Sequence, residues 1–259
     1  MPTPLEILLD PISLIVIGIY ASLFIWESIF PGRKLPKMKF WVFRGIFAFM
    51  FYFFLASYLP LLWDNYLASY QLLDLSGTNP AIAGLAGVML YQFGVYVWHR
   101  TMHKNDGLWR IFHQMHHSAE RIDIPSAFYF SPLDMIGWTF LSSLCFALIM
   151  GLSAQATTIV LLTLNFMGMF QHANIKTPQW LGYIIQRPES HSLHHARGVH
   201  AHNYSDMPVF DILFGTFKNP KDFIPETGFY DGASSQVVDM LMCKDLNARE
   251  KKTKLKVAD

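Results

Sequence analysis

The chain has 259 residues, of which 52% are hydrophobic and 15% aromatic, and its mean hydropathy is +0.26. This composition is too apolar for a typical soluble domain, so we expect an integral membrane protein. The formal net charge of +1 excludes the strongly basic surface that a nucleic-acid-binding protein needs. The two cysteines, Cys145 and Cys243, have no metal-binding spacing and are too few for a disulfide framework.

Three apolar runs in the first hundred residues are long enough to cross a bilayer core of about 30 Å as helices. They cover residues 12–30, 46–63 and 81–98. The first run is too long for a signal-peptide core and lacks a small-residue cleavage site, so we expect it to be retained. A fourth region, residues 135–170, is long enough for two passes and is interrupted at 151–153. It predicts a helical hairpin, either spanning or re-entrant.

The charges of the short loops predict the orientation of these helices, because loops rich in lysine and arginine tend to stay in the cytoplasm. The loop between the first two runs carries basic residues at positions 33, 34, 37, 39 and 44. The next loop carries Asp64 and Asp74 and no basic residue. The first loop is therefore expected in the cytoplasm. Counting onward places residues 99–134 and the chain from 172 on that same side.

All eleven histidines lie between His99 and His202, and most of them form three clusters. The first cluster is His99 and His103, the second is His113, His116 and His117, and the third is His191, His194 and His195. On a helix, residues three and four apart face the same way, so each cluster is expected to present its imidazoles on one stripe. Eight imidazoles exceed what one ion can use, which predicts two metal ions. Imidazole binds zinc, copper, iron and nickel alike, so the ligands do not identify the metal.

The expected roles of the other polar residues are assigned from how far they lie from the three clusters along the sequence. His172 follows the hairpin at the depth of the clusters and is expected to be a ligand, whereas His200 and His202 are interpreted as neighbours of the ligands or surface groups. A ligating histidine usually donates its second N–H to an acceptor. The available carboxylates are Glu120, Asp123, Asp134, Glu189, Asp206 and Asp211. Among these, Asp134 or Glu189 is best placed by proximity, although a solvated loop charge or a helix cap is the commoner role of any single carboxylate.

Several catalytic motifs are missing from the sequence. It has no E-x-x-H pair of the soluble di-iron bundles, no H-E-x-x-H protease helix and no G-x-S-x-G elbow. It also lacks a phosphate loop and a dinucleotide fingerprint. A zinc-dependent hydrolase or a metal transporter could use the same imidazoles. Transport is disfavoured, because the centres of the predicted helices carry almost no ionisable groups.

The order of the three clusters, with a membrane hairpin between the second and third, resembles the fatty acid hydroxylase and sterol desaturase superfamily of integral-membrane di-iron enzymes. The resemblance rests on Trp98-His99-Arg100, on H-Q-x-H-H-S at 113–118, on Asn203-Tyr204 and on the closing segment 211–217. It spans residues 85–218 and looks closest to the alkylglycerol monooxygenase and bacterial hydroxylase branch. The chain departs from the family pattern at His200 and His202, and at position 205, where serine replaces the glycine of many relatives.

The resemblance implies that nine histidines bind two irons, which activate dioxygen. These are His99, His103, His113, His116, His117, His172, His191, His194 and His195. It implies hydroxylation of a C–H bond in a membrane lipid of fatty acyl, alkyl or sterol-like type, with electrons from an external electron-transfer protein. Zinc can replace iron during purification. Desaturation at the same site is the close alternative, and no residue separates the two reactions.

These expectations combine into one architecture: an all-α, membrane-embedded catalytic domain over 1–259, with about four transmembrane helices or hairpins and a cytosolic helical cap. Residues 1–98 form three helices, 99–134 hold two histidine clusters, 135–171 form the hairpin, and 172–259 form the third cluster and the cap. The active site is expected on the cytoplasmic side of a bacterial inner membrane or of the endoplasmic reticulum. Residues 47–54 and 128–130 either line the lipid channel or pack between helices. The basic tail 249–256 could bind an acidic electron donor or the anionic leaflet of the membrane. The alternative is that it is a solvated chain end.

Overall fold

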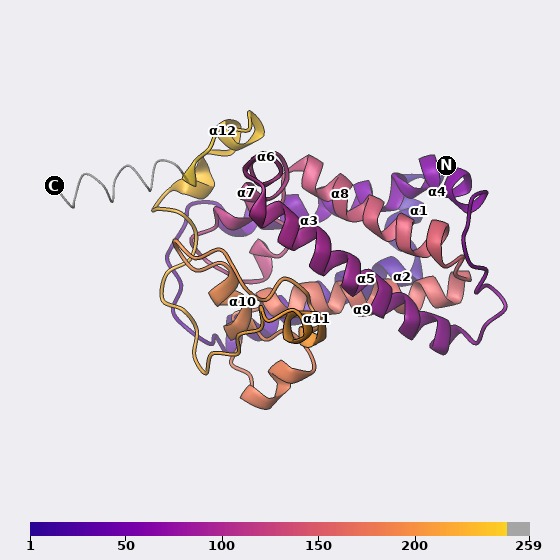
Figure 1. Cartoon of the computed structure of the whole chain (residues 1–259). Helices are drawn as coiled ribbons and strands as arrows, with labels where there is room; N and C mark the ends of the chain where they lie inside the picture. Colours follow the sequence, from indigo (N-terminus) through magenta and orange to yellow (C-terminus); the bar gives the residue numbers. More distant parts are fainter. Residues whose placement is uncertain (248–259) are drawn as a thin grey trace.

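The computed structural model describes residues 1–247 and is all-helical within that range, where the only β-type pairing is an isolated bridge between Ala196 and Thr227. The long helices lie side by side, and the short helices α6, α7, α10 and α12 gather toward the end of the bundle remote from the N-terminus (Figure 1). This confirms the predicted all-α class. The basic segment 249–256 lies outside the described residues.

The long elements follow the predicted runs closely. They are α2 (Pro11–Ile29), α3 (Trp41–Tyr58), α4 (Pro60–Ala68), α5 (Pro80–Lys104), α8 (Pro132–Ser143) with the π-helix η3 (Leu144–Ile149), and α9 (Ala154–His172). Four stretches are long and apolar enough to cross a membrane: Pro11–Ile29, Trp41–Ala68, Pro80–Lys104 and Pro132–Ile149. Large apolar side chains such as Phe43 and Phe47 are 70% and 63% exposed, as lipid-facing residues should be.

The short elements carry the loops and the histidine clusters. They are α1 (Pro4–Leu9), α6 (Asp106–Leu108), the π-helix η1 (Trp109–His113), α7 (Gln114–His117), η2 (Ile124–Ser126), η4 (Gln179–Tyr183), α10 (Pro188–His194), α11 (Pro208–Leu213), η5 (Ala233–Ser235) and α12 (Val237–Leu241). The first cluster, at the end of α5, thus leads directly into the second.

A capping residue followed by proline begins three of the long helices. The side chains of Asp10, Asn79 and Ser131 each accept a hydrogen bond from a backbone N–H of the first turn of α2, α5 and α8, respectively. The proline that follows each cap has no N–H to leave unpaired and already has a helical φ. The local sequence therefore fixes where these helices start.

The predicted hairpin is present, but its two arms pack mainly against different helices, although α5 contacts both arms. The chain turns at Gly151, whose φ of +54° is left-handed and whose Cβ position would lie 2.6 Å from the Leu73 carbonyl oxygen, so only glycine fits. The first arm, α8, packs on α3 and α4, whereas the second arm, α9, packs on α5 and α2. This separation leaves room for a cavity between the arms.

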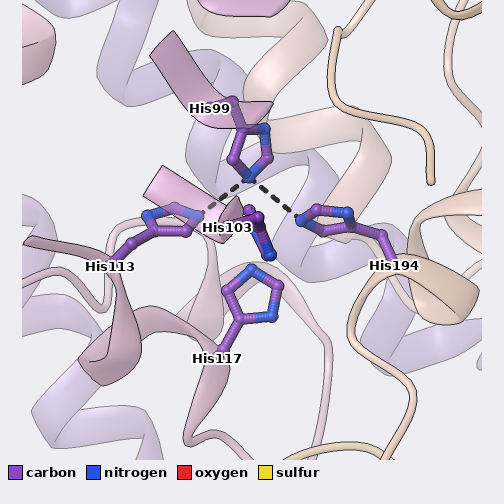
Figure 2. Close-up of side chains that lie close together, drawn as sticks. All are labelled: His99, His103, His113, His117 and His194. Carbon is purple, nitrogen blue, oxygen red and sulfur yellow. Dashed lines mark hydrogen bonds between the residues drawn. The ribbon is translucent and has the colours of Figure 1, made fainter. Parts of the chain in front are cut away.

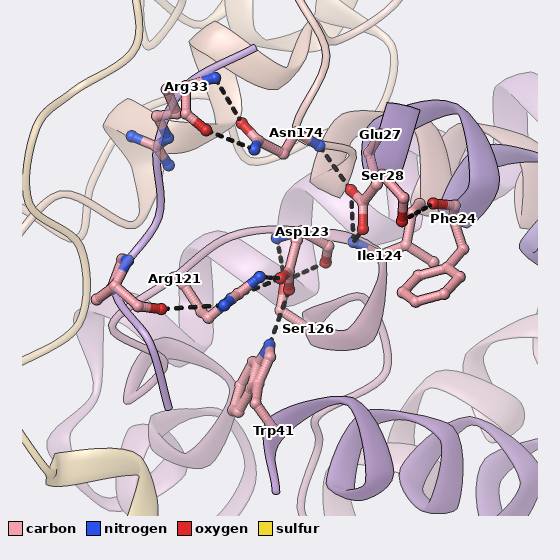
Figure 3. A network of polar contacts seen from close by, with 11 residues as sticks. Phe24, Glu27, Ser28, Arg33, Trp41, Arg121, Asp123, Ile124, Ser126 and Asn174 are labelled. Atoms are coloured by element: carbon pink, nitrogen blue, oxygen red, sulfur yellow. Dashed lines mark hydrogen bonds and ion pairs between the residues drawn. The ribbon is translucent and has the colours of Figure 1, made fainter. Parts of the chain in front are cut away.

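A buried carboxylate in α2 holds together three segments near the histidines (Figure 3). Glu27 accepts hydrogen bonds from the backbone N–H of Ile124, at 3.0 and 3.1 Å, and of Asn174, at 2.8 Å. The Asn174 side chain in turn bonds the backbone of Arg33, accepting from its N–H at 3.1 Å and donating to its carbonyl at 2.8 Å. The basic loop after α2 therefore lies at the same end of the bundle as His172.

A second buried carboxylate fixes the start of α3. Asp123 accepts a hydrogen bond from Trp41 Nε1 at 2.9 Å and pairs with Arg121 (Figure 3). Trp41 is the first residue of α3, and Asp123 follows the second histidine cluster by six positions. The contact thus ties a membrane helix to the loop that leaves the histidine region.

Candidate metal centre

Nine histidines come together in two adjacent buried groups. The five-histidine group is His99, His103, His113, His117 and His194, shown in Figure 2. The four-histidine group is His116, His172, His191 and His195. Within each group, one nitrogen from each ring lies within 4.8 Å of the others. These nine residues are the ones that the sequence singled out, and the rings of His200 and His202 belong to neither group.

Each cluster of three histidines divides between the two groups, which differs from the expectation that it forms one stripe. The pairs four residues apart stay together, whereas the histidine between them belongs to the other group. His116 and His117 therefore face different groups, and so do His194 and His195. Adjacent helical residues point about 100° apart, which makes this division possible. The rings of His117 and His195 stack at 4.0 Å where the two groups meet.

The nitrogen spacing within the groups matches a coordination sphere. The Nε2 of His99 lies 2.9 Å from that of His113 and 3.0 Å from that of His194 (Figure 2). In the four-histidine group the corresponding Nε2–Nε2 distances are 3.0 to 3.1 Å. Two nitrogens that each lie about 2.1 Å from one ion, at right angles, are about 3.0 Å apart. The spacing therefore fits one ion per group.

Hydrogen bonds at the far side of the rings determine which nitrogen carries the proton. Five histidines use Nδ1: His99 with the carbonyl of Tyr204, His103 with that of His200, His194 with that of His202, His172 with that of Gly168, and His113 with the carboxylate of Asp134, all at 2.7 to 2.8 Å. These oxygens only accept, so each Nδ1 must donate. A neutral imidazole has one N–H, which leaves a lone pair on each Nε2. Lone pairs that face one another at 3 Å fit a cation between them.

The loop after the third cluster supplies three of these carbonyls. His200, His202 and Asn203 have φ values of 42°, 70° and 50°, in the left-handed region that most residues avoid. The Asn203 side chain stabilises this conformation by donating to the carbonyls of Ser190 and Lys218 at 3.0 and 2.9 Å. His200 and His202, which lie outside the two groups, therefore support the metal centre mainly through their backbone carbonyls, which accept hydrogen bonds from the ligand rings. The His200 ring also lies against the five-histidine group, with its Nδ1 3.1 Å from Nδ1 of His117.

The two favoured carboxylates have different roles. Asp134 accepts from Nδ1 of His113, as expected of an acceptor beside a ligand. Glu189 is not an acceptor for a histidine and has the structural role that is commoner for a single carboxylate. Its carboxylate accepts from the backbone N–H and hydroxyl of Thr177, both at 2.8 Å, and lies 3.1 Å from Arg187. Glu189 is close to the third cluster in sequence, but it faces away from the two groups.

The other carboxylates near the clusters also make hydrogen bonds that stabilise the fold and accept none from the ligand rings. Asp206 accepts from two glutamine amides, Asp211 from the backbone N–H of Tyr204 and Ser205, and Glu120 from the backbone N–H of Ser234. The sequence could not predict that backbone carbonyls are the main acceptors, because every residue carries one.

Burial keeps the imidazoles neutral at physiological pH. Desolvation lowers the pKa of six histidines outside the membrane spans well below the ordinary value of 6.5: His113, His116, His117, His191, His194 and His195. It lowers the pKa of His200 to about 4. Neutral imidazole is the form that binds metal. In addition, the buried Nε2 atoms of His103 and His117 have no hydrogen-bond partner among residues 1–247, an arrangement that a metal ion would satisfy.

A cavity of about 490 Å³ reaches the two groups from between the hairpin arms. Histidines of both groups line one end: His99, His113, His116, His172 and His191. The lining then follows α9 back to Thr157, roughly 20 Å at the rise of an α-helix. Most of it is apolar, as in a site for an alkyl chain. Of the aromatic segments proposed for the channel, Phe49, Phe53 and Phe128 line the cavity, whereas Phe47 faces outward.

Comparison with known proteins agrees with this geometry. The fatty acid hydroxylase family model matches residues 84–216, which include all nine histidines. The chain is 28% identical to an ornithine lipid hydroxylase of Rhizobium tropici over 138 residues, covering 52% of this chain and 41% of the relative. It is 32% identical to the alkylglycerol monooxygenase of Homo sapiens over 172 residues, covering 63% of this chain and 36% of the relative.

A third relative carries a different name. The chain is 26% identical over 162 residues to a very-long-chain aldehyde decarbonylase of Oryza sativa subsp. indica, covering 58% of this chain and 26% of the relative. The matched part is thus less than half the length of each of these three relatives. No solved structure matches the chain. Because the family model covers half of the sequence and the whole histidine region, the chain belongs to the fatty acid hydroxylase family.

Proposed function

We propose that the protein is an O2-dependent di-iron monooxygenase that hydroxylates a C–H bond in the chain of a membrane lipid. The observation that carries the proposal is the position of two groups of neutral, buried imidazoles at the end of an apolar cavity inside a membrane bundle. An alkyl C–H bond is too unreactive for any side chain to cleave, so a redox metal has to supply the reactivity. The relatives named as hydroxylases and monooxygenases support the same class of reaction.

Each histidine group would hold one iron. The bound pair would reduce dioxygen so that one oxygen atom enters the C–H bond and the other leaves as water, with two electrons and two protons from outside the active site. In this proposal the electrons come from an external electron-transfer protein, since residues 1–259 carry no recognisable haem, flavin or iron–sulfur motif.

The protein's own residues hold the ligands in place and position the substrate. The carbonyls of the 200–204 loop and the Asp134 carboxylate orient rings in the five-histidine group. The cavity walls exclude water and align an alkyl chain with its reacting carbon toward the histidines. Because both groups line the same end of the cavity, one substrate can approach both ions.

The active site is proposed to face the cytoplasm. Arg33, in the basic loop after α2, bonds Asn174, two residues beyond His172. The loop that the charge rule keeps in the cytoplasm therefore lies at the histidine end of the bundle. The same rule applies to a bacterial inner membrane and to the endoplasmic reticulum.

Lipid profiling tests this proposal against its alternatives. Cells that express the wild-type protein are compared with cells that express His117→Ala, and the purified protein is assayed after iron reconstitution with a reductant. We expect one lipid species to gain the mass of one oxygen atom in the wild type only. A species that loses two hydrogens instead would show a desaturase. Turnover with zinc and without a reductant would show a hydrolase and overturn the proposal.

A further inference from the structure

We propose that the side-chain oxygen of Gln171 binds a hydrogen-bond donor on the substrate and so directs oxidation to carbons close to the lipid's polar group. This inference rests on the proposed function and deepens it, because it assigns the orientation of the substrate in the cavity. Gln171 immediately precedes His172 on α9 and lines the cavity beside the four-histidine group.

A hydrogen-bond network fixes the direction of the Gln171 amide. Gln92 Oε1 accepts from the backbone N–H of Asp206 at 3.0 Å and from the hydroxyl of Ser205 at 2.8 Å, so its nitrogen must face the Asp206 carboxylate. Gln92 Nε2 donates to Asp206 Oδ2 at 2.8 Å, and Gln171 Nε2 donates to Asp206 Oδ1 at 2.6 Å. Burial raises the pKa of Asp206, but the two amide donors favour its ionised form. An ionised carboxylate only accepts, so Gln171 presents its nitrogen to Asp206 and its oxygen elsewhere.

The Gln171 oxygen is an unused acceptor in a buried place. Gln171 is only 6% exposed, and its Oε1 has no hydrogen-bond partner within the part of the chain that the structure describes. Buried polar atoms are nearly always paired, and an unpaired one that lines a cavity indicates a missing partner. A substrate hydroxyl or amide N–H at this point would supply the partner. Its alkyl chain would then extend along the apolar lining, away from the histidines.

One other side-chain oxygen that lines the cavity could bind the polar group of the substrate and would place the substrate in the opposite orientation. Asp64 Oδ1 also lines the cavity, is buried and has no partner among residues 1–247, but it lies on α4, far from the histidines. A polar group bound there would place the far end of the chain at the metal centre. We favour Gln171 because its residue is almost fully buried and its amide is held in one direction, whereas Asp64 is only partly buried.

A binding measurement with two probes tests the orientation without relying on turnover. Hexadecanol and its methyl ether have nearly the same chain, but only the alcohol can donate a hydrogen bond. Each is measured by displacement of a fluorescent long-chain alcohol from the metal-loaded protein in detergent. We expect the wild type to prefer the alcohol by about tenfold, the effect of one hydrogen bond. We expect Gln171→Met to lose this preference and to bind the ether as the wild type does.

Two matched variants separate the proposed contact from damage to the network. Gln92→Met also removes an amide donor from Asp206, but Gln92 does not line the cavity, so the preference should remain. Asp64→Leu, which removes the alternative acceptor, should likewise keep the preference. If Gln171→Met fails to retain its metal, Gln171→Leu provides a second replacement.

Three results would overturn the inference: equal binding of both probes by the wild type, a preference that survives both Gln171 replacements, or a preference that disappears in Asp64→Leu. None of these depends on product formation. Failure of the lipid assay would contradict the proposed hydroxylation and leave the measured binding ratio standing, so the two proposals can fail separately.

Discussion

The two histidine groups come from the same part of the chain but are tethered differently. In the five-histidine group, four rings donate Nδ1 to a carbonyl or carboxylate, and the fifth, His117, lies against the ring of His200. In the four-histidine group only His172 donates to a backbone carbonyl, and Nδ1 of His191 lies 3.0 Å from Nε2 of Gln186. Nδ1 of His116 and of His195 is buried without a partner among residues 1–247. The five-histidine group is therefore the more rigid of the two.

The groups also differ in their access to the cavity. Three of the four rings in the four-histidine group line it: His116, His172 and His191. Of the five-histidine group, only His99 and His113 do so. Because it has fewer ligands, fewer hydrogen bonds to its rings and more contact with the cavity, we expect that the four-histidine group would hold its ion less firmly than the five-histidine group. The difference shows that hydrogen bonds to the ligands, as well as their number, decide how firmly a site is built.

Ligand removal should have the largest effect. Both His117→Ala and His195→Ala should abolish turnover while the protein stays in the membrane, because either change disrupts one of two ions that act together. The metal content should differ, since His117→Ala leaves four ligands in its group and His195→Ala leaves three. Metal analysis of the purified variants measures this. Full turnover in either variant would contradict the ligand assignment. Equal metal loss in both variants would contradict the proposal that the two groups hold their ions with different strength.

Acidification should release both ions. The folded pKa values of His113, His116, His117, His191, His194 and His195 lie well below 6.5, so below about pH 6.5 the unfolded chain binds more protons than the folded chain. The contribution of these residues to stability is therefore complete above that pH and is lost as the pH falls.

Protons also compete directly with the metal for the same nitrogens. Because the pKa values of the folded histidines lie well below 6.5, we expect the metal content after desalting to be constant from about pH 8 to 6.5 and to fall as the pH decreases further, with the four-histidine group emptying first. Metal analysis over a pH series checks this. Retention of both ions at about pH 4 would contradict it.

Asp134→Asn should weaken the five-histidine group by an intermediate amount. The substitution keeps the shape but replaces the carboxylate that accepts from His113, and loss of such a partner typically costs about 10- to 100-fold in metal affinity or activity. Glu189→Gln is the matched control, since Glu189 pairs with Arg187 and contacts no histidine. It should lower the thermal stability and leave metal affinity unchanged. Competition with a chelator measures the affinities, and a similar loss in both variants would refute the distinction.

The smallest effect is expected at His200. In His200→Asn the ring contact with His117 is lost, but asparagine tolerates the left-handed φ, so the carbonyl that accepts from His103 stays in place. Activity should fall by less than about tenfold, the effect of one hydrogen bond. His200→Pro should be much worse, because proline cannot adopt a φ of 42°. Equal activity of the two variants would show that the carbonyl does not matter.

Much of the fold and of the candidate site follows from local sequence features. The apolar runs predicted the membrane helices, and the break at residues 151–153 predicted the turn of the hairpin. The caps with proline at the starts of α2, α5 and α8, which the structure reveals, are local features of the same kind. The histidine spacing identified eight members of the two groups, and the position of His172 at the end of the hairpin identified the ninth. These features could be predicted because helix periodicity, capping and chain length act over a few residues.

Tertiary structure alone decided how these parts combine. The chain's own order gives no sign that His116 joins His172 while His117 joins His99, because that depends on which helix faces each side of a short element. The acceptors for His99 and His103 lie 105 and 97 positions further along the chain, on backbone atoms that every residue has. Proximity in sequence likewise favoured Glu189 as much as Asp134. Sequence determines residue identity and local geometry, whereas contacts between distant segments exist only after the chain has packed.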